Sequence, residues 1–170
     1  LNFVKEAKKE EKTFLFVSTN PALRNIVKEA AEKTDSFYVT ERWIGGILTN
    51  FGEIKKRLKY FNELEASVAQ ADFSEKYVKK ERLQIVKTLE RLKLKFGGVK
   101  KMEKIPDVVF IVDLEKNNLA LKEAVDTKRT IIAIADTNVD PTKINYIIPA
   151  NDDAVSSVEY ILKQVTNSMQ

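Results

Sequence analysis

The sequence predicts an α/β fold, a doubly wound parallel sheet flanked by helices, and three observations support this. Short apolar runs that fit buried strands alternate with segments that have helical spacing. Turn and capping residues separate these segments at short intervals, as expected for βαβ units with right-handed crossovers. One central stretch, residues 51–96, breaks the alternation because it has helical spacing throughout and contains no proline. We therefore expect one sheet domain with an inserted helical element.

The elements before the central stretch follow from periodicity and caps. Apolar residues at helical spacing predict a helix within residues 1–12, and the run at 13–18 predicts a strand buried on both faces. Asn20-Pro21 combines a capping residue with a proline suited to a first helical position, which predicts a helix from there to about Lys33. Residues 36–39 form the second expected strand.

The second half repeats the pattern. The expected strands lie at residues 107–112, 130–135 and 146–148, and a helix is expected over residues 118–127. Asp140-Pro141 marks another helix start, and a last helix is expected from Asn151 to about Val165. We interpret Asp140 and the group at 151–153 as capping residues, because such side chains accept the free N–H groups of a helix start.

The central stretch carries two narrow apolar stripes. Apolar residues recur close to heptad spacing from Phe51 to Val68 and again from Val78 to Phe96, with Arg82 at one seam position. The break falls at residues 69–73, and Ser74-Glu75 is the expected start of a second helix of roughly 22 residues, after a first of roughly 18. We expect an antiparallel coiled-coil hairpin that projects from the sheet, so that residues 1–50 and 97–170 form the sheet domain and residues 51–96 the hairpin.

Composition restricts the chemistry. The chain has no His and no Cys, which rules out Ser-His-Asp and Cys-His nucleophiles and leaves almost no means of building a structural zinc site. Any metal would be a hard cation on Asp or Glu oxygens. The apolar runs are far shorter than the roughly 20 residues that a membrane-spanning helix needs. Enzymes without His exist, so this composition disfavours catalysis without excluding it, and we expect no metal, cofactor, membrane or small-molecule substrate.

The positive charge belongs to one segment. Residues 53–104 hold 15 Lys and Arg against 8 Asp and Glu, a net of +7, whereas the other residues hold 14 against 17, a net of −3. A solvated coiled-coil surface is also rich in Lys and Glu, but so large a local surplus favours binding to phosphates of nucleic acid. The candidate RNA-binding residues are Arg42, Trp43, Asn50, Lys55, Lys56, Arg57, Lys59, Lys79, Lys80, Arg82, Lys100 and Lys101.

The segment of residues 41–51 joins the sheet to the hairpin and contains the only Trp. Its paired glycines permit a tight backbone path, and Thr49 or Asn50 can cap the first arm. Arg42 beside Trp43 can stack on a base or phosphate, or can pack the root of the hairpin, and packing is the favoured interpretation for the pair.

Two alternatives remain open from the residues alone. Asp113 and Asp136 follow the second and third buried strands, where ligands of open α/β sheets bind, so they could hold Mg²⁺ for nucleotide binding or phosphoryl transfer. No glycine-rich phosphate loop accompanies them, and Asp is an ordinary loop residue at such positions. In the other alternative the hairpin docks a protein in place of RNA.

Four blocks in order resemble the small-subunit ribosomal protein S-two family of bacterial or organellar type. The most specific is Arg42-Trp43-Ile44-Gly45-Gly46-Ile47-Leu48-Thr49-Asn50-Phe51, and the apolar run Phe14-Leu15-Phe16-Val17 stands ahead of the four. The blocks at 106–113, 133–141 and 148–154 follow the hairpin, so the resemblance covers essentially the whole chain.

This resemblance implies a flavodoxin-like sheet with a protruding coiled-coil hairpin, no catalysis, and binding to small-subunit ribosomal RNA between head and body. It implies neighbouring ribosomal proteins as partners, including the large protein S-one in bacteria. The location implied is the bacterial cytoplasmic ribosome, or else a plastid or mitochondrial one.

The chain departs from the family in two places. The family usually carries a further segment before the first helix, so we expect this chain to be a fragment or the ordered part of a longer protein. Family members often have His where Glu41 stands, and the negative charge of Glu41 disfavours RNA contact by this residue.

Overall fold

The computed structural model describes residues 1–70, 72–136 and 140–170. Its centre is a five-stranded sheet in the order β2-β1-β3-β4-β5, and each neighbouring pair is parallel. This order is that of flavodoxin-like doubly wound folds, so the predicted fold class is confirmed. The strands are β1 Phe14–Val17, β2 Phe37–Val39, β3 Val108–Val112, β4 Thr130–Ala135 and β5 Tyr146–Pro149.

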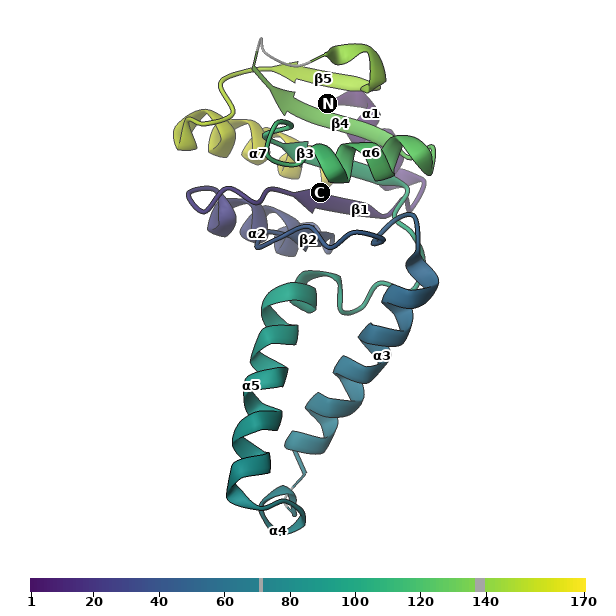
Figure 1. The fold of residues 1–170 in the computed structure, drawn as a ribbon. Coiled ribbons are helices and arrows are strands. Elements are labelled where there is room, and N and C mark those ends of the chain that lie inside the picture. The colour runs from purple at the N-terminus through teal and green to yellow at the C-terminus, as the bar shows by residue number, and fades with distance from the viewer. Residues whose placement is uncertain (71, 137–139) are drawn as a thin grey trace.

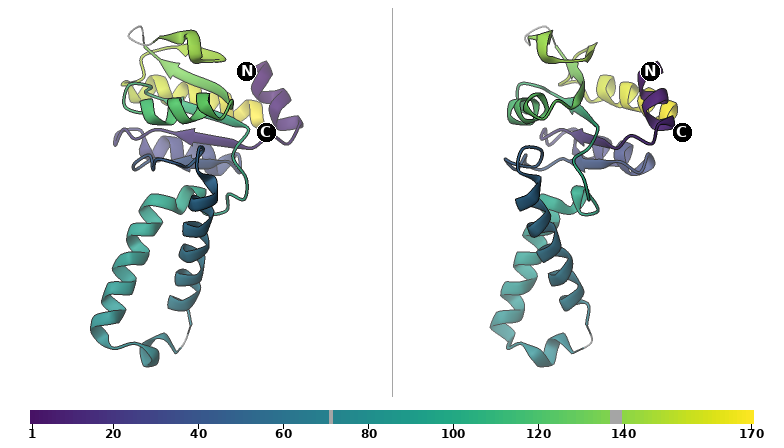
Figure 2. Two further views of the ribbon diagram at one scale, coloured as in Figure 1. Left: turned by 45° about the vertical axis from the view of Figure 1, so that its right-hand side comes forward. Right: turned by 90° about the vertical axis from the view of Figure 1, so that its right-hand side faces the viewer.

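Helices cover both faces of the sheet (Figures 1 and 2). One face carries α1 Asn2–Lys9, α2 Arg24–Lys33 and α7 Val155–Met169, and the other carries α6 Asn118–Asp126. Alternate residues of the central strands enter two separate apolar cores, as with Phe110 toward α2 and α7 and Ile111 toward α6. Because β1 and β3 are buried at every position, they appear in the sequence as continuous apolar runs.

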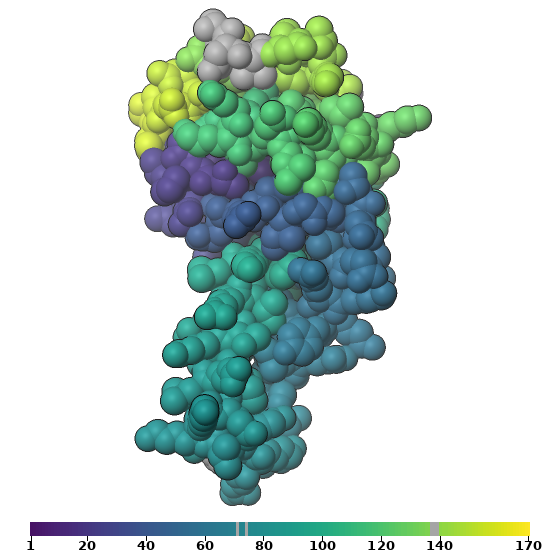
Figure 3. All heavy atoms as spheres, in the orientation of Figure 1, coloured from purple at the N-terminus to yellow at the C-terminus, as the bar shows by residue number. Residues whose placement is uncertain are grey.

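The helical insertion consists of α3 Phe51–Val68, the single turn α4 Phe73–Lys76 and α5 Lys79–Phe96, followed by the 3₁₀ turn η1 Gly97–Val99. The two long helices are connected through α4 at the far end and stand out from the sheet domain as a narrow arm (Figures 1 and 3). Each has 18 residues and therefore extends about 27 Å.

The turns of the arm nearest the sheet are anchored in the core. Ile54, Leu58 and Phe61 of α3 are buried in the same apolar cluster as Leu15 of β1. Farther out the packing is looser, and Leu83 of α5 is 57% exposed. A regular coiled-coil seam along the whole arm stays a prediction.

Three predicted helix starts are wrong. The second arm begins at Lys79, not at Ser74, because Tyr77 is extended and Glu81 Oε2 accepts the N–H of Val78 at 3.2 Å. It is therefore 18 residues long and not about 22. Ala71, within the predicted break, lies outside the described residues.

The other two wrong starts involve Asn20 and Asn151, whose side chains close turns ahead of α2 and α7. Asn20 Oδ1 accepts the N–H of Ala22, and Asn151 Oδ1 accepts those of Asp153 and Ala154. The helices consequently begin three or four residues later, at Arg24 and Val155. Asp140 does act as a cap, accepting the N–H of Thr142 at 3.0 Å, but of the short 3₁₀ turn η2 Pro141–Lys143.

Gly98 lets the chain leaving α5 lie against the edge strand β2. A Cβ built on Gly98 would sit 2.2 Å from the carbonyl oxygen of Tyr38, which cannot move without breaking the strand. We expect Gly98→Ala to lower the free energy of unfolding by about 2 kcal/mol, measured by urea denaturation. Gly97→Ala is the matched control, because nothing lies within 4 Å of its Cβ position. Equal stability of the two variants would contradict this close approach.

Candidate nucleic-acid interface at the base of the hairpin

The segment joining β2 to the hairpin is held by a buried carboxylate on α6. The side chain of Glu123, 4% exposed, accepts five hydrogen bonds from this segment. Oε1 accepts the indole N–H of Trp43 at 3.0 Å and the backbone N–H of Gly46 at 2.8 Å. Oε2 accepts the backbone N–H groups of Leu48 and Thr49 at 3.0 and 3.2 Å and the Thr49 hydroxyl at 3.1 Å. The chain thus wraps around one side chain before it enters α3.

These hydrogen bonds also control the ionisation of Glu123. Burial raises the pKa of a carboxyl group, but the donors of Trp43, Gly46, Leu48 and Thr49 outweigh burial and lower the pKa of Glu123 below its ordinary value. The group is therefore ionised in the folded protein at neutral pH. Gly46 adopts φ +94°, which glycine tolerates and which turns its N–H toward the carboxylate.

This arrangement bears on Trp43, a candidate RNA contact, and on the residues that could cap the first arm. Trp43 is 7% exposed and its indole N–H is bound to Glu123, so its ring is not available to stack on a base. Packing, the favoured interpretation for Trp43, agrees with the structure. Of Thr49 and Asn50, either of which could cap the first arm, Asn50 occupies the N-cap position but forms no side-chain cap hydrogen bond, and the Thr49 hydroxyl binds Glu123. Arg42 and Asn50 remain exposed.

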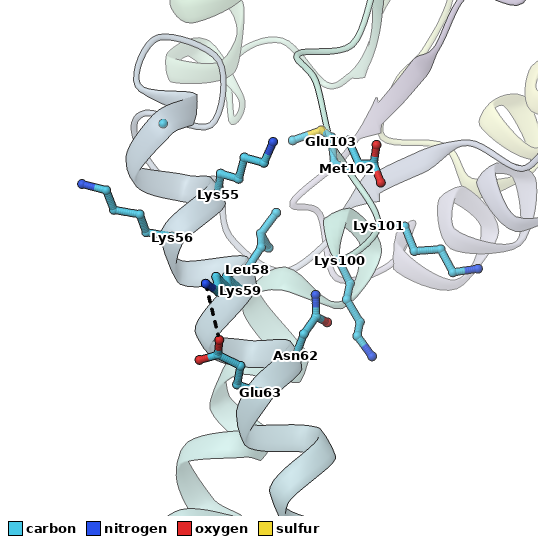
Figure 4. A pocket seen from close by; sticks show the side chains of 11 residues that line it. Lys55, Lys56, Leu58, Lys59, Asn62, Glu63, Lys100, Lys101, Met102 and Glu103 are labelled. Atoms are coloured by element: carbon cyan, nitrogen blue, oxygen red, sulfur yellow. Dashed lines mark ion pairs between the residues drawn. The ribbon is translucent and has the colours of Figure 1, made fainter.

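Five lysines line a hollow where α3 meets the segment that follows η1. We call this the basal hollow; its volume is about 770 Å³. Figure 4 shows Lys55, Lys56 and Lys59 on α3, and Lys100 and Lys101 on the facing segment. Two acidic side chains, Glu63 and Glu103, share the lining, which leaves a surplus of three positive charges. Sequence positions some 45 residues apart are thereby brought to one surface.

Among the described residues, some lysines of the basal hollow form ion pairs and others do not. Lys56 pairs with Glu53 at 2.6 Å and Lys59 with Glu63 at 3.8 Å, both within α3 and largely exposed. Such surface pairs exchange readily for a phosphate partner. Across residues 1–70, 72–136 and 140–170 no ion pair is formed by Lys55, Arg57 or Lys101, and all three are exposed.

Lys100 has a different role from its neighbours. Its ammonium pairs with Glu65 of α3 and lies 5.4 Å from the centre of the Phe61 ring. Lys93 of α5 approaches the same carboxylate at 3.5 Å, so Glu65 links α3, α5 and the segment after η1. The Lys100 contact, followed by Lys93, lowers the pKa of Glu65. Lys100 therefore braces the base of the arm, and we do not retain it as an RNA contact.

The remaining predicted contacts lie apart from the base. Lys79 and Lys80 are exposed on the first turn of α5, at the far end of the arm. Arg82 is half-buried, which fits its predicted place in the seam. The structure therefore divides the predicted set into a basal group and a tip group.

Of the two strand-end aspartates, Asp113 is committed to a neighbouring residue. Asp113, 4% exposed, accepts the backbone N–H of Lys116 at 3.1 Å, and its second oxygen lies 2.8 Å from the Lys116 ammonium. Lys116 also reaches Asp153 at 3.2 Å. Asp136 directly follows β4, and Thr137-Asn138-Val139 of its block lie outside the described residues. Among the residues that are described, no three Asp or Glu side chains gather in a metal-binding arrangement.

Sequence reasoning missed two features. Glu123 lies on an ordinary helical stretch and gives no local signal of its partners, which are 74 to 80 positions away. A second group of cations, Arg24, Lys28, Lys93 and Lys95, comes from α2 and α5 and lines another hollow. Only Lys93 and Lys95 lie in the segment singled out by its charge.

In the part of the chain that the structure describes, no helix combines the length and apolar character needed to cross a membrane.

Comparison with known proteins agrees with this architecture. The family model described as Ribosomal protein S2 matches residues 1–170. The chain is 42% identical over 167 residues to the protein of Dictyoglomus thermophilum named small ribosomal subunit protein uS2, covering 98% of this chain and 68% of that one. Proteins of the same name from Roseiflexus and Petrotoga mobilis are 41% and 42% identical, with 98% and 99% of this chain and 63% and 58% of theirs covered.

The chain thus spans about three fifths to two thirds of the length of these relatives. The match of the family model to residues 1–170 and the similarity to these relatives lead to the same family as the four sequence blocks. The chain belongs to the ribosomal protein S2 family.

Proposed function

We propose that this chain is a structural protein of the small ribosomal subunit that binds ribosomal RNA with the base of its hairpin. The observation that carries the proposal is the basal hollow, where lysines of α3 and of the distant segment after η1 line one surface with a surplus of three positive charges. Lys and Arg neutralise phosphates and release counterions, while the shape of the RNA backbone, more than base identity, supplies recognition. The family assignment supports the ribosome as the setting.

The proposed RNA contacts are residues whose side chains are exposed and are not needed to hold the base of the arm together. Lys100 is left out because it braces Glu65, and Trp43 because it is buried. The proposed basal contacts are Arg42, Asn50, Lys55, Lys56, Arg57, Lys59 and Lys101. Lys79, Lys80 and Arg82 form a separate tip group, which would reach either RNA or a neighbouring ribosomal protein.

The arrangement of the chain and its partners forms part of the same proposal. Residues 1–50 and 97–170 act as the sheet domain, and residues 51–96 act as the arm. The partners are small-subunit ribosomal RNA and neighbouring ribosomal proteins, among them the large protein S-one in a bacterial ribosome. The bacterial relatives support the bacterial cytoplasm as the location over a plastid or mitochondrion.

The alternative of a Mg²⁺-dependent nucleotide-binding enzyme is not retained. The family to which the chain belongs is described as a ribosomal protein. Asp113, which that alternative needs as a metal ligand, is paired with Lys116 instead.

Binding to small-subunit ribosomal RNA fragments across a salt series tests the proposal. If about six phosphates are neutralised, log Kd should change linearly with log salt concentration, with a slope of magnitude about 4 to 5 (roughly 0.7 to 0.9 per phosphate). Large-subunit RNA fragments of equal length are the control and should bind more weakly at physiological salt. Co-sedimentation with the small subunit provides an independent readout. A flat salt response would exclude binding through phosphates.

A further inference from the structure

A second basic hollow lies on the other helix of the hairpin, where the end of α5 faces α2 and the end of β2. We call it the α2–α5 hollow; its volume is about 420 Å³. It shares no lining residue with the basal hollow. Four cations line it, Arg24 and Lys28 from α2 and Lys93 and Lys95 from α5, against the single carboxylate of Glu41. Its surplus of three positive charges equals that of the basal hollow.

Only some of the cations around this hollow form ion pairs within the described protein. Within the described parts of the chain Lys95 forms no ion pair, and the Lys28 ammonium approaches Glu32 only to 3.9 Å along an exposed helix face. Lys93 shares Glu65 with Lys100, so this carboxylate is already neutralised by a closer cation. At least two cations of the hollow, Lys28 and Lys95, are therefore stabilised little or not at all by ion pairs with the residues that the structure describes.

Arg24 is held in place beside the hollow. One of its terminal nitrogens pairs with Glu41 at 2.9 Å, while its buried Nε has no hydrogen-bond partner in the described structure. A guanidinium carries five N–H donors in a fixed fork, so a single carboxylate contact leaves donors available. Glu41 thus orients an arginine at the rim of this hollow.

The remaining lining fits a phosphate backbone better than an apolar partner. Asn25, Tyr38 and Thr40 add polar groups, and Gly97 leaves open space where a side chain would stand. The hollow is also connected to the proposed interface, because Lys93 meets Lys100 of the basal hollow at the carboxylate of Glu65. A polar, cationic concavity beside a proposed RNA contact is what phosphate groups require.

We propose that the α2–α5 hollow is a second binding site for backbone phosphates of the same ribosomal RNA. Arg24, Lys28, Lys93 and Lys95 neutralise phosphates on the α5 side, while the basal lysines do so on the α3 side. The RNA then contacts both helices of the arm at its base, and its backbone fixes the arm relative to the sheet. This inference rests on the proposed function, because it names a further contact of the same partner.

The test uses the full chain and the double variant Lys28→Glu with Lys95→Glu. Both side chains are exposed, so the variant should fold, which its urea midpoint checks. We expect affinity for small-subunit RNA fragments to fall about ten-fold at physiological salt, and the magnitude of the salt slope to fall by about 1.5, as for two lost phosphate contacts. Lys28→Gln with Lys95→Gln should give a similar loss of slope without introducing negative charge.

Two controls separate the effect of position on RNA binding from the effect of net charge. Lys5→Glu with Lys163→Glu makes the same charge change on exposed positions of α1 and α7 and should bind like the wild type. Lys28→Arg with Lys95→Arg keeps the charge and should retain affinity. Wild-type affinity and slope in the Lys28→Glu, Lys95→Glu variant would overturn the second site while leaving the basal contact standing. An absence of salt-dependent RNA binding in the wild type would overturn both proposals.

Discussion

Replacing Glu123 by glutamine is expected to lower the free energy of unfolding by about 3 kcal/mol, although the two side chains have nearly the same size. The carboxylate accepts two N–H groups at Oε1 and three donors at Oε2. A glutamine amide must place its NH₂ group at one of these positions, where it faces donors. The less costly orientation leaves the Trp43 indole and the Gly46 N–H without an acceptor, and each buried unsatisfied donor costs about 1 to 3 kcal/mol.

Urea denaturation measures the stability of this variant, and the only Trp of the chain provides a local readout. Because Trp43 is buried against Glu123, loosening of this segment should shift its emission to longer wavelength and increase its quenching by solutes. Glu159→Gln, at an exposed position on α7, is the matched control and should change neither quantity. A Glu123→Gln protein with wild-type stability and emission would show that the segment does not depend on this carboxylate.

The same pair of proteins should differ in their response to acid. The folded pKa of Glu123 lies below its ordinary value of 4.5, so the native state binds this proton less readily than the unfolded chain does. The stabilising contribution is therefore fully present above about pH 4.5 and is lost as the pH falls through the folded pKa. The stability difference between wild type and Glu123→Gln should be constant near neutrality and shrink below pH 4.5. Comparing the two proteins removes the titration of the other carboxylates.

The centre of the sheet could be predicted from sequence because β1, β3 and β4 are buried on both faces, whereas the edge strands β2 and β5 are largely half-buried or exposed. The five residues of β3 and the last five of β4 form continuous apolar runs, and the prediction for β4 matches its bounds. The helix starts were less predictable. Asn20 and Asn151 have the residue type of a cap, but a side chain that accepts a backbone N–H serves a turn as well as a helix. Local chemistry alone does not separate these outcomes.

The candidate site was predictable in its charge but not in its geometry. Counting charged residues located the basic surplus, and the apolar periodicity predicted that this segment forms two helices, as the structure shows. Whether a given lysine is available depends on partners far away in the chain. Lys100 is occupied by Glu65, 35 residues earlier, whereas its neighbour Lys101 has no ion pair among the described residues. The α2–α5 hollow joins residues about 70 positions apart, one half of which lies outside the basic segment.

Charge reversal at the base of the arm is expected to have the largest effect on RNA binding. In the variant Lys55→Glu, Lys56→Glu and Arg57→Glu, three exposed cations on successive positions of α3 become anions. We expect affinity for small-subunit RNA fragments to fall about 100-fold at physiological salt, and the magnitude of the salt slope to fall by about 2 to 3, because three phosphate contacts are lost. The sheet should remain folded, since exposed substitutions cost little stability.

The matched variant Lys79→Glu, Lys80→Glu and Lys87→Glu applies the same charge change to exposed positions on α5 of the same arm. Its affinity should fall much less if the base holds the RNA, because the basal hollow stays intact. Equal losses in the two variants would mean that the whole arm attracts RNA and that the base has no special role. Unfolding of the basal variant alone would show that this part of α3 packs inward. A large loss confined to the basal variant, with both proteins folded, would place the RNA contact where α3 enters the sheet domain.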